Sequence, residues 1–238
     1  MTSPEEHRAD TTGPPAEERV DDRFGRLALL GEPIRRALYR YVASRPQAVS
    51  REQAAEAVGV AQHTAKFHLD RLESGGLLDA SYQRPDDRGG PGAGRPAKVY
   101  RRSDEEISVS VPERRYEVLS AVMAAAVEAA ADSGVDLSGA LQRAAETAGR
   151  DAVGHGEDVT QALTGVGYEP RVEDGTLILA NCPFHRLARE HTGLVCDINL
   201  AFVRGLLAAA GDDGFTPRLS PCAGRCCVVL APEADSAS

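Results

Sequence analysis

The sequence lacks any apolar run long enough to cross a membrane, which takes about 18 consecutive residues for a helix. It also lacks a positive-then-apolar pattern near its start, where the composition is acidic and polar. These two absences predict a cytoplasmic protein with no membrane partner, in a compartment that keeps thiols reduced. The 238 residues, 42% of them apolar, are enough for one large or two smaller folded domains.

Three motifs typical of enzymes are missing as well. The sequence has no Cys-x-x-Cys pair, no glycine-rich nucleotide loop and no nucleophile elbow. We therefore expect a protein that binds its partners and is not an enzyme.

Cysteine is absent from the first 181 residues, and all five cysteines lie between residues 182 and 227. Core thiols would be scattered along the chain, so this clustering predicts a shared ligand. An odd number of cysteines in a reducing compartment argues against a disulfide framework. The candidate metal ligands are Cys182, Cys196, Cys222, Cys226 and Cys227.

The spacing of these cysteines differs from the paired two-residue spacing of zinc ribbons, whereas an iron–sulfur cluster tolerates irregular spacing. We expect Cys196 to open a helix, where the helix dipole favours the thiolate. Adjacent Cys226 and Cys227 would point to opposite faces of a strand, so three or four thiols are expected to bind and at least one to stand aside. Either His185 or His191 could complete a site of three thiols. Zinc, or reduced cysteines without a metal, are the alternatives to the cluster.

Composition and periodicity divide the chain into segments of mixed α and β structure. Proline, glycine and charged residues dominate its first part, which shows no apolar period. We expect a disordered tail (1–21), a winged helix-turn-helix domain (22–105), a helical linker and dimerisation segment (106–156), an α+β cysteine-containing sensor domain (157–232) and a final tail (233–238).

A helix-turn-helix pattern lies between residues 50 and 73. Ser50 and Gln53 have the spacing of a capping box that opens one helix, and Gly59 ends that helix. The next helix, 62–73, is predicted to turn its polar residues outward, as a recognition helix does in the major groove. The candidate base contacts are Gln62, His63, Thr64, Lys66 and His68.

A basic loop follows this pattern. Residues 77–82 and 97–101 predict two antiparallel strands, and the loop 85–96 between them is rich in glycine and arginine. The net charge of the chain is −9, but residues 84–102 contain six basic and two acidic residues, and local charge governs contact with phosphate. A solvated loop is the alternative; directly after a helix-turn-helix, we interpret the loop as a wing on a double-stranded DNA operator. The expected phosphate contacts are Arg84, Arg88, Arg95 and Lys98.

An apolar, alanine-rich helix is predicted from Pro112 to about Asp132. Its wide apolar stripe fits either a protein core or a seam between two chains. We favour a homodimer, because winged heads commonly read two half-sites through a two-fold axis. Further along, Asp174-Gly175 lies between two alternating segments and predicts a two-residue hairpin turn.

Residues 22–102 resemble the winged helix-turn-helix of the ArsR-like bacterial regulators. Within them, Gly94–Tyr100 resembles the wing strand of SufR-type members of that group. Three further phrases are similar to the carboxy-terminal half of the same family, so the resemblance covers residues 22–230. They are Asn-Cys-Pro-Phe-His at 181–185, Leu-Val-Cys at 194–196 and Cys-Cys-Val-Val-Leu at 226–230.

The resemblance implies a regulator of iron–sulfur assembly genes that senses an iron–sulfur cluster through its carboxy-terminal domain. It makes Cys182, Cys196 and the Cys226–Cys227 pair the firmer ligands, with a less certain role for Cys222. The alternative is a regulator whose carboxy-terminal domain binds a small molecule and whose cysteines are structural.

Overall fold

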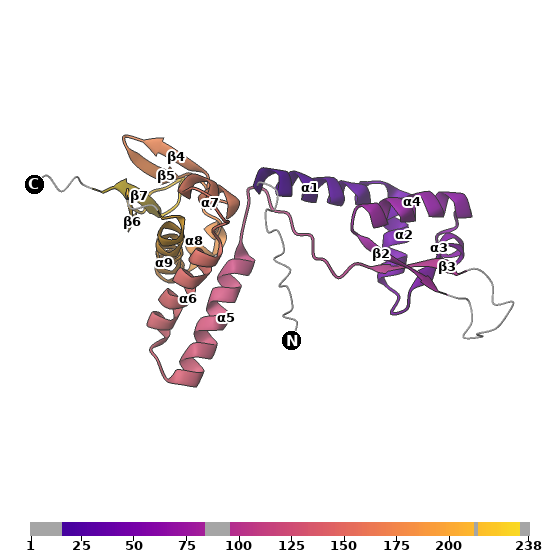
Figure 1. Ribbon diagram of the computed structural model, residues 1–238, viewed down its shortest axis with the longest axis horizontal. Coiled ribbons are helices and arrows are strands. Elements are labelled where there is room, and N and C mark those ends of the chain that lie inside the picture. Colours follow the sequence, from indigo (N-terminus) through magenta and orange to yellow (C-terminus); the bar gives the residue numbers. More distant parts are fainter. Residues whose placement is uncertain (1–15, 84–95, 212–213, 234–238) are drawn as a thin grey trace, which may run out of the picture. The chain divides into compact units, whose positions relative to one another are not determined.

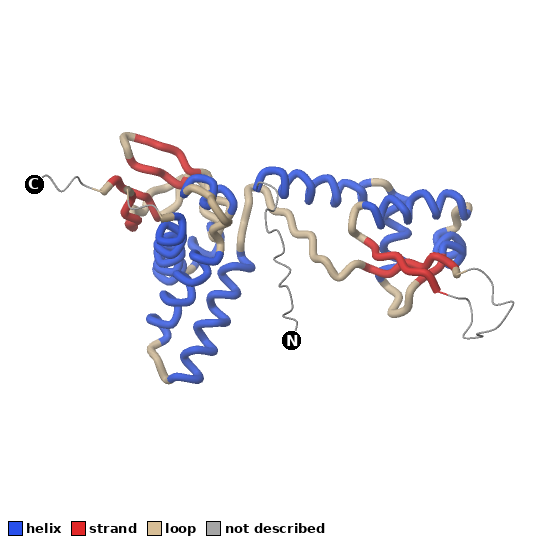
Figure 2. The backbone as a smooth tube through the Cα atoms, in the orientation of Figure 1, coloured by secondary structure: helices blue, strands red, loops and turns tan. Residues whose placement is uncertain are grey.

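The computed structural model describes residues 16–83, 96–211 and 214–233 of the chain (Figures 1 and 2). They form two compact units: an N-terminal unit, Glu18–Val109, and a C-terminal unit that contains Ser110–Ser238. Each unit combines helices with a small antiparallel sheet, which confirms the expected mixed α and β fold.

The N-terminal unit places its helices around a sheet with the strand order β1-β3-β2. The two-residue strand β1 was not expected from the sequence. The helical segments are α1 (Ala16–Ala28), η1 (Leu29–Gly31), α2 (Pro33–Ala43), α3 (Arg51–Val58) and α4 (Gln62–Ser74), and the strands are β1 (Val49–Ser50), β2 (Leu78–Gln83) and β3 (Ala97–Arg102).

The prediction of a disordered tail over residues 1–21 is wrong from Ala16 onward, because α1 begins there. The sequence Ala-Glu-Glu-Arg at 16–19 consists of strong helix formers, so it forms a helix without an apolar period of its own. Residues 1–15 lie outside the described part of the chain.

The helix-turn-helix forms where the sequence predicts it. Ser50 caps α3 in a reciprocal capping box with Gln53, and Gly59 ends the helix with a φ of 73°. Leu38 of α2, Leu69 of α4 and Tyr100 of β3 are fully buried in one core, which fixes α4 against α2 and the sheet.

The C-terminal unit pairs a four-stranded sheet, in the order β4-β5-β7-β6, with a group of helices. Asp174 and Gly175 have φ values of 48° and 75° between β4 and β5, as expected for a two-residue hairpin. The helices are α5 (Tyr116–Ser133), α6 (Leu137–Asp151), α7 (Val159–Gly165), α8 (His185–Glu190) and α9 (Thr192–Ala210), and the strands are β4 (Pro170–Glu173), β5 (Thr176–Leu179), β6 (Phe215–Leu219) and β7 (Val228–Pro232).

Helices α5 and α6 belong to the same core as the sheet, so residue 156 is not a domain boundary. Leu119 and Val122 of α5 lie in one buried cluster with Leu179 of β5 and Leu230 of β7. The expectation of a separate helical linker over 106–156 is therefore wrong, because the apolar stripe of α5 covers the core of the C-terminal unit.

Helix α9 is the central helix of this unit. Its length and apolar composition would also suit a membrane span, but 56% of its most apolar window is buried inside the fold, as in the core helix of a globular unit. It packs against α6 (Figure 1). Two glycines allow this close approach: a Cβ atom on Gly149 would lie 2.0 Å from the carbonyl oxygen of Phe202, and one on Gly205 would lie 2.0 Å from that of Glu146.

We predict that Gly205→Ala destabilises the C-terminal unit by about 1–3 kcal/mol, because α6 and α9 must separate to admit the methyl group. Gly193→Ala is the matched control in the same helix, since a Cβ there meets nothing within 4 Å. It should be neutral or stabilising by up to about 1 kcal/mol. Urea unfolding of both variants measures the difference, and equal stabilities would contradict the close contact.

Candidate DNA-binding surface and cysteine pocket

The outward face of α4 carries most of the predicted base contacts. Gln62, His63 and Lys66 are exposed, and Thr64 is half-buried. The opposite face is buried because Ala65, Leu69 and Leu72 recur at helical spacing. A row of polar side chains on an exposed helix after a helix-turn suits insertion into the major groove.

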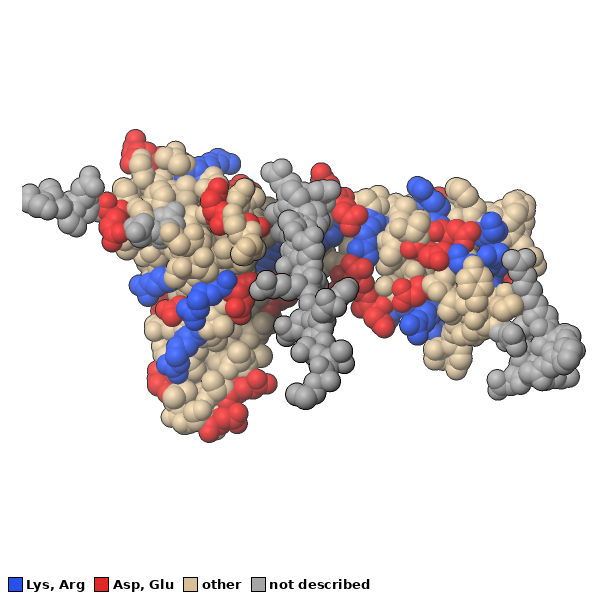
Figure 3. All heavy atoms as spheres, viewed as in Figure 1, with Lys and Arg blue, Asp and Glu red and all other residues tan. Residues whose placement is uncertain are grey.

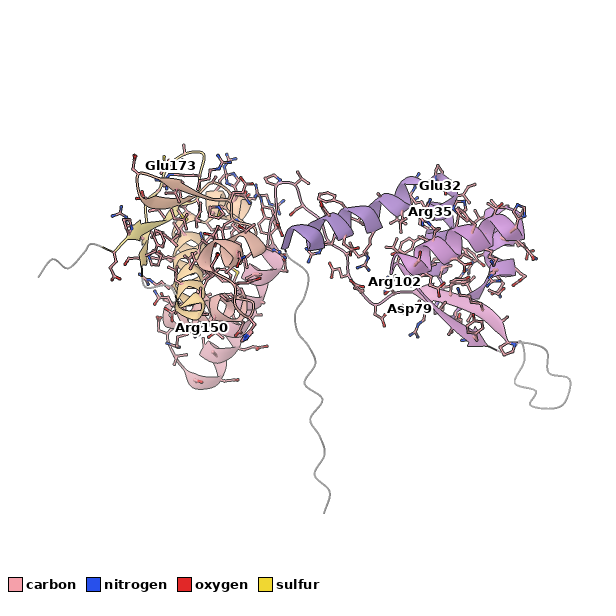
Figure 4. The ribbon with its side chains drawn as sticks, turned by 45° about the horizontal axis from the view of Figure 1, so that its top comes forward. Glu32, Arg35, Asp79, Arg102, Arg150 and Glu173 are labelled. Carbon is pink, nitrogen blue, oxygen red and sulfur yellow. The ribbon has the colours of Figure 1, made fainter. Side chains whose placement is uncertain are left out.

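His68 does not belong to this outward face, contrary to the sequence prediction. Only 9% of the residue is exposed, and it shares the buried face of α4 with Leu69 and Leu72. Its Nδ1 lies 3.5 Å from a carboxylate oxygen of Glu32, which caps the start of α2 by accepting from the backbone N–H groups of Ile34 and Arg35. Figure 4 labels Glu32 and Arg35 at this helix start. We therefore assign His68 a packing role between α4 and α2.

Phe67 is a surface residue that the sequence reasoning missed. It is 61% exposed, next to Lys66 and four positions after His63 on α4. A large apolar ring is costly to leave in water without a partner, and on a recognition helix it can contact a thymine methyl group. The sequence could have indicated this exposure, because Phe67 lies outside the helical spacing of the apolar residues Ala65, Leu69 and Leu72.

Lys98 was predicted to contact phosphate, but the structure engages it inside the N-terminal unit. Its ammonium pairs with Glu73 and lies 3.0 Å from Asp70, and the Lys98 side chain is only 14% exposed. Tyr100 donates a hydrogen bond of 2.7 Å to the same Asp70 carboxylate. Burial lowers the pKa of Lys98, but the hydrogen bonds to Glu73 and Asp70 outweigh burial and raise the pKa above its usual value. The network ties β3 to α4 and so orients the recognition helix.

The basic residues of the predicted wing divide into two groups. Arg84, Arg88 and Arg95 lie outside the described residues. Arg101 and Arg102 are exposed at the end of β3, where Arg101 lies 3.9 Å from Asp79 on β2; Figure 4 labels Asp79 and Arg102. In the view of Figure 3, basic and acidic side chains lie side by side over this unit, in keeping with such ion pairs.

The five cysteines line one pocket of about 460 Å³ in the C-terminal unit. Three separate segments supply them: the turn after β5 carries Cys182, α9 carries Cys196, and the loop before β7 carries the others. Gly224, with a φ of 83°, allows the turn in that loop. His185 of α8 also lines the pocket, whereas His191 is an exposed residue at the start of α9. The structure therefore brings together residues up to 45 positions apart in the sequence.

Two expectations about individual cysteines are corrected. Cys196 is the fifth residue of α9, which begins at Thr192, so the helix N-terminus does not favour its thiolate. Burial instead raises the pKa of Cys196 to about 12. Cys226 and Cys227 precede β7 and are not in extended strand, and both line the pocket. Cys222 is exposed at the rim.

Four of the thiols influence one another's pKa in a chain of pairs: Cys182 with Cys226, Cys226 with Cys227, and Cys227 with Cys196. The Cys226 thiol acts as donor to Cys182, which lowers the pKa of Cys182 and raises that of Cys226 to about 12. The contact with Cys226, together with burial, also raises the pKa of Cys227. The ionisation of each of these thiols therefore depends on its neighbours in the pocket.

The sulfur of Cys226 also accepts hydrogen bonds from the protein. The side-chain amide of Asn199, which is 1% exposed, donates to it over 3.1 Å, and the backbone N–H of Val228 donates over 3.5 Å. Asn199 is held in turn by the hydroxyl of buried Tyr168. Hydrogen bonds to sulfur of this kind tune thiolates in metal and iron–sulfur sites.

The pocket also contains a cationic group with an unsatisfied nitrogen. Nη1 of Arg225 is buried without a hydrogen-bond partner, while Nη2 lies 3.2 Å from the hydroxyl of Ser220. A buried guanidinium nitrogen without a partner favours an anionic neighbour. Sulfur donors and this cation fit a thiolate-bound anionic group. Within the described residues, however, no three His, Cys, Asp or Glu side chains surround a common point as the ligands of one metal ion do.

Comparison with known proteins identifies the N-terminal unit. Residues 30–79, from η1 to the start of β2, match a family model described as a helix-turn-helix domain. No curated protein matches the chain. Among solved structures, human N-acetylserotonin methyltransferase in complex with SAM is 14% identical to this chain with a TM-score of 0.25; the match covers 85% of this chain and 49% of that one.

The matched region and the hairpin after it define a winged helix-turn-helix DNA-binding domain. The protein is a DNA-binding transcriptional regulator.

We predict that replacing two lysines of the N-terminal unit affects different properties: DNA binding for Lys66 and folding stability for Lys98. Lys66, predicted as a base contact, is exposed and only loosely paired with Asp70 at 3.7 Å, so Lys66→Met should lower the slope of log affinity against log salt by about 0.9, the value for one cation lost from the DNA contact. Lys98→Met should leave the slope unchanged but cost roughly 1–2 kcal/mol of folding stability, because Glu73 loses its ion-pair partner at a partly exposed site and Asp70 keeps only Tyr100 and the longer pair with Lys66. Salt titrations on DNA selected in vitro, with thermal unfolding, separate the two effects. If the salt slope changes in Lys98→Met and not in Lys66→Met, Lys98 contacts phosphate after all.

We predict that Phe67 reads a thymine methyl group. Replacing the relevant thymine of the selected DNA by uracil should weaken binding of the unmodified protein by about 1 kcal/mol, the lower end of discrimination by one base contact. Phe67→Ala should bind both DNAs equally. If the variant still distinguishes thymine from uracil at every position, Phe67 does not contact the methyl group.

Proposed function

We propose that the C-terminal unit binds an iron–sulfur cluster, or alternatively zinc, and that its occupancy sets the affinity of the winged helix-turn-helix for its operator. The observation that carries the proposal is the convergence of Cys182, Cys196 and the Cys226–Cys227 pair, from three segments, on one pocket. These are the thiols that the SufR-type resemblance favours, and thiolate-rich ligation suits both groups.

The surroundings of the thiols support an anionic occupant. Cys226 accepts hydrogen bonds from Asn199 and Val228, and the backbone N–H of Phe184 stabilises the thiolate of Cys182. Arg225 adds positive charge at the same wall. When bound, a cluster supplies a redox- and iron-responsive group to a site that the protein keeps buried.

Regulation requires two states of the protein with different affinities for DNA. We propose that the protein works as a homodimer in the cytoplasm, without catalysing a reaction. Helix α5 supports the dimer, because it buries Leu119, Val122 and Ala126 within its own unit but leaves Val127 58% exposed on another face. The resemblance further suggests control of iron–sulfur assembly genes.

We predict that anaerobically purified protein contains iron and acid-labile sulfide and absorbs visible light. Cys182→Ser, Cys196→Ser and Cys226→Ser should each lose most of the iron, because each removes a buried sulfur of the pocket. Cys222→Ser is the matched control and should keep it, since Cys222 is exposed at the rim. Iron and sulfide assays with ultraviolet–visible spectra provide the measurement. A colourless protein with stoichiometric zinc would select the zinc alternative, and a protein with neither would contradict the proposal.

The size of the pocket favours a second candidate, a small-molecule effector with structural cysteines. Its volume of about 460 Å³ lies within the range of ligand sites, roughly 300–1,000 Å³. In that case the Cys→Ser variants would lower stability, and effector-dependent release of DNA would persist in the metal-free protein.

A further inference from the structure

The segment that enters the C-terminal unit from the DNA-binding unit is bonded directly to the turn that carries Cys182. We call residues 110–115, which precede α5, the connector, and residues 181–183 the Cys182 turn. The backbone N–H of Arg115 donates to the carbonyl of Pro183 over 3.1 Å. The guanidinium of Arg114 donates to the side-chain oxygen of Asn181 and, over 3.3 Å, to the carbonyl of Cys182. The connector therefore holds two backbone carbonyls of this turn.

Asn181 makes most of the hydrogen bonds of this contact. It is 8% exposed, and both the oxygen and the nitrogen of its side-chain amide form hydrogen bonds. The oxygen accepts from Arg114, while the nitrogen donates to the carbonyl of Glu113 over 3.0 Å and to that of Gly167 over 2.6 Å. A side chain of another shape would leave buried carbonyl groups without donors, so asparagine is closely specified here.

A second clamp holds the same connector. Arg115 pairs with Glu113 at 2.7 Å and donates to the carbonyl of Gly165 over 2.8 Å. The side chain of Glu113 also lies against Gly167, where a Cβ atom would be 3.1 Å away. The connector is thus fixed to two turns of the C-terminal unit, and only the Cys182 turn reaches the pocket.

From these contacts we infer that Arg114 and Asn181 are positioning residues that transmit the state of Cys182 to the connector. Asn181 and Cys182 share a peptide bond, so a shift of the Cys182 backbone that accompanies ligation of its sulfur would move the carbonyls and the amide that hold Arg114 and Arg115. The connector continues through Val109 into the DNA-binding unit. The inference rests on the proposed function, because it needs an occupant of the cysteine pocket.

The test compares Arg114→Gln with the unmodified protein in two states, anaerobically isolated and stripped of metal by chelator. Arg171→Gln is the matched control, since exposed Arg171 on β4 pairs only weakly with exposed Glu169 at 3.7 Å. Three quantities are measured: metal and sulfide content, the ratio of Kd values of the two states for DNA selected in vitro, and hydrogen exchange of residues 110–116.

We expect Arg114→Gln to keep the metal content of the unmodified protein but to lower the Kd ratio at least fivefold, toward 1, within the usual range of coupling between sites. Its connector amides should exchange at the same rate in both states, whereas those of the unmodified protein and of Arg171→Gln should differ. Arg114→Lys, which keeps a donor for Asn181, should restore part of the ratio. Asn181→Ser is a second variant that tests the same contact from the other side.

The outcomes separate the two proposals. An unmodified protein that binds no metal overturns the proposed function and this inference with it. A normal Kd ratio and a normal exchange difference in folded, metal-loaded Arg114→Gln and Asn181→Ser overturn the inference alone. If metal changes connector exchange but not DNA affinity, and Arg114→Gln abolishes that change, the inference holds and the regulatory proposal fails.

Discussion

The close approach of α6 and α9 is the contact on which the C-terminal unit depends. Gly149 and Gly205 let the two backbones come within reach of each other's carbonyl groups, so α9 becomes the central helix of the core. That position buries Cys196 and Asn199 on the side of α9 that faces the loop before β7. The cysteine pocket is therefore a product of helix packing as much as of the cysteines themselves.

The N-terminal unit depends on a different kind of contact. Lys98, Tyr100 and Asp70 join the sheet to α4 through partly buried charge, which orients the recognition helix but takes one cation away from the DNA. Acidic side chains of this unit, including Asp70, which lies 3.7 Å from Lys66, therefore compete with phosphate for the basic residues of a chain whose net charge is −9. Ion pairing inside the domain thus limits which lysines and arginines contribute to affinity.

Periodicity and turn residues were sufficient to predict most elements, including the capping box at Ser50 and the hairpin at Asp174-Gly175, because these signals are local. The predictions were wrong where tertiary packing determines whether a side chain is exposed and which residues it contacts. His68 looks polar and available in the sequence, but its position on α4 turns it toward α2, and the partners of Lys98 are 25 and 28 residues away. The clustering of cysteines predicted a shared ligand, which stays a prediction, and the structure places the five cysteines around one pocket. The contact of Arg114 with Asn181 spans 67 residues and has no counterpart in local sequence pattern.

The backbone around Cys226 and Cys227 continues the ladder of the sheet on both sides. The N–H of Cys226 donates to the carbonyl of Leu179 over 2.9 Å, and the carbonyl of Cys227 accepts from Ser220 over 2.7 Å. These two cysteines therefore lie in a backbone segment bonded to both neighbours of β7, whereas Cys182 lies on a turn held by side chains. The two cysteine-bearing parts of the pocket are therefore held in different ways, one by backbone hydrogen bonds to the neighbouring strand ends and the other by the side chains of Arg114 and Asn181.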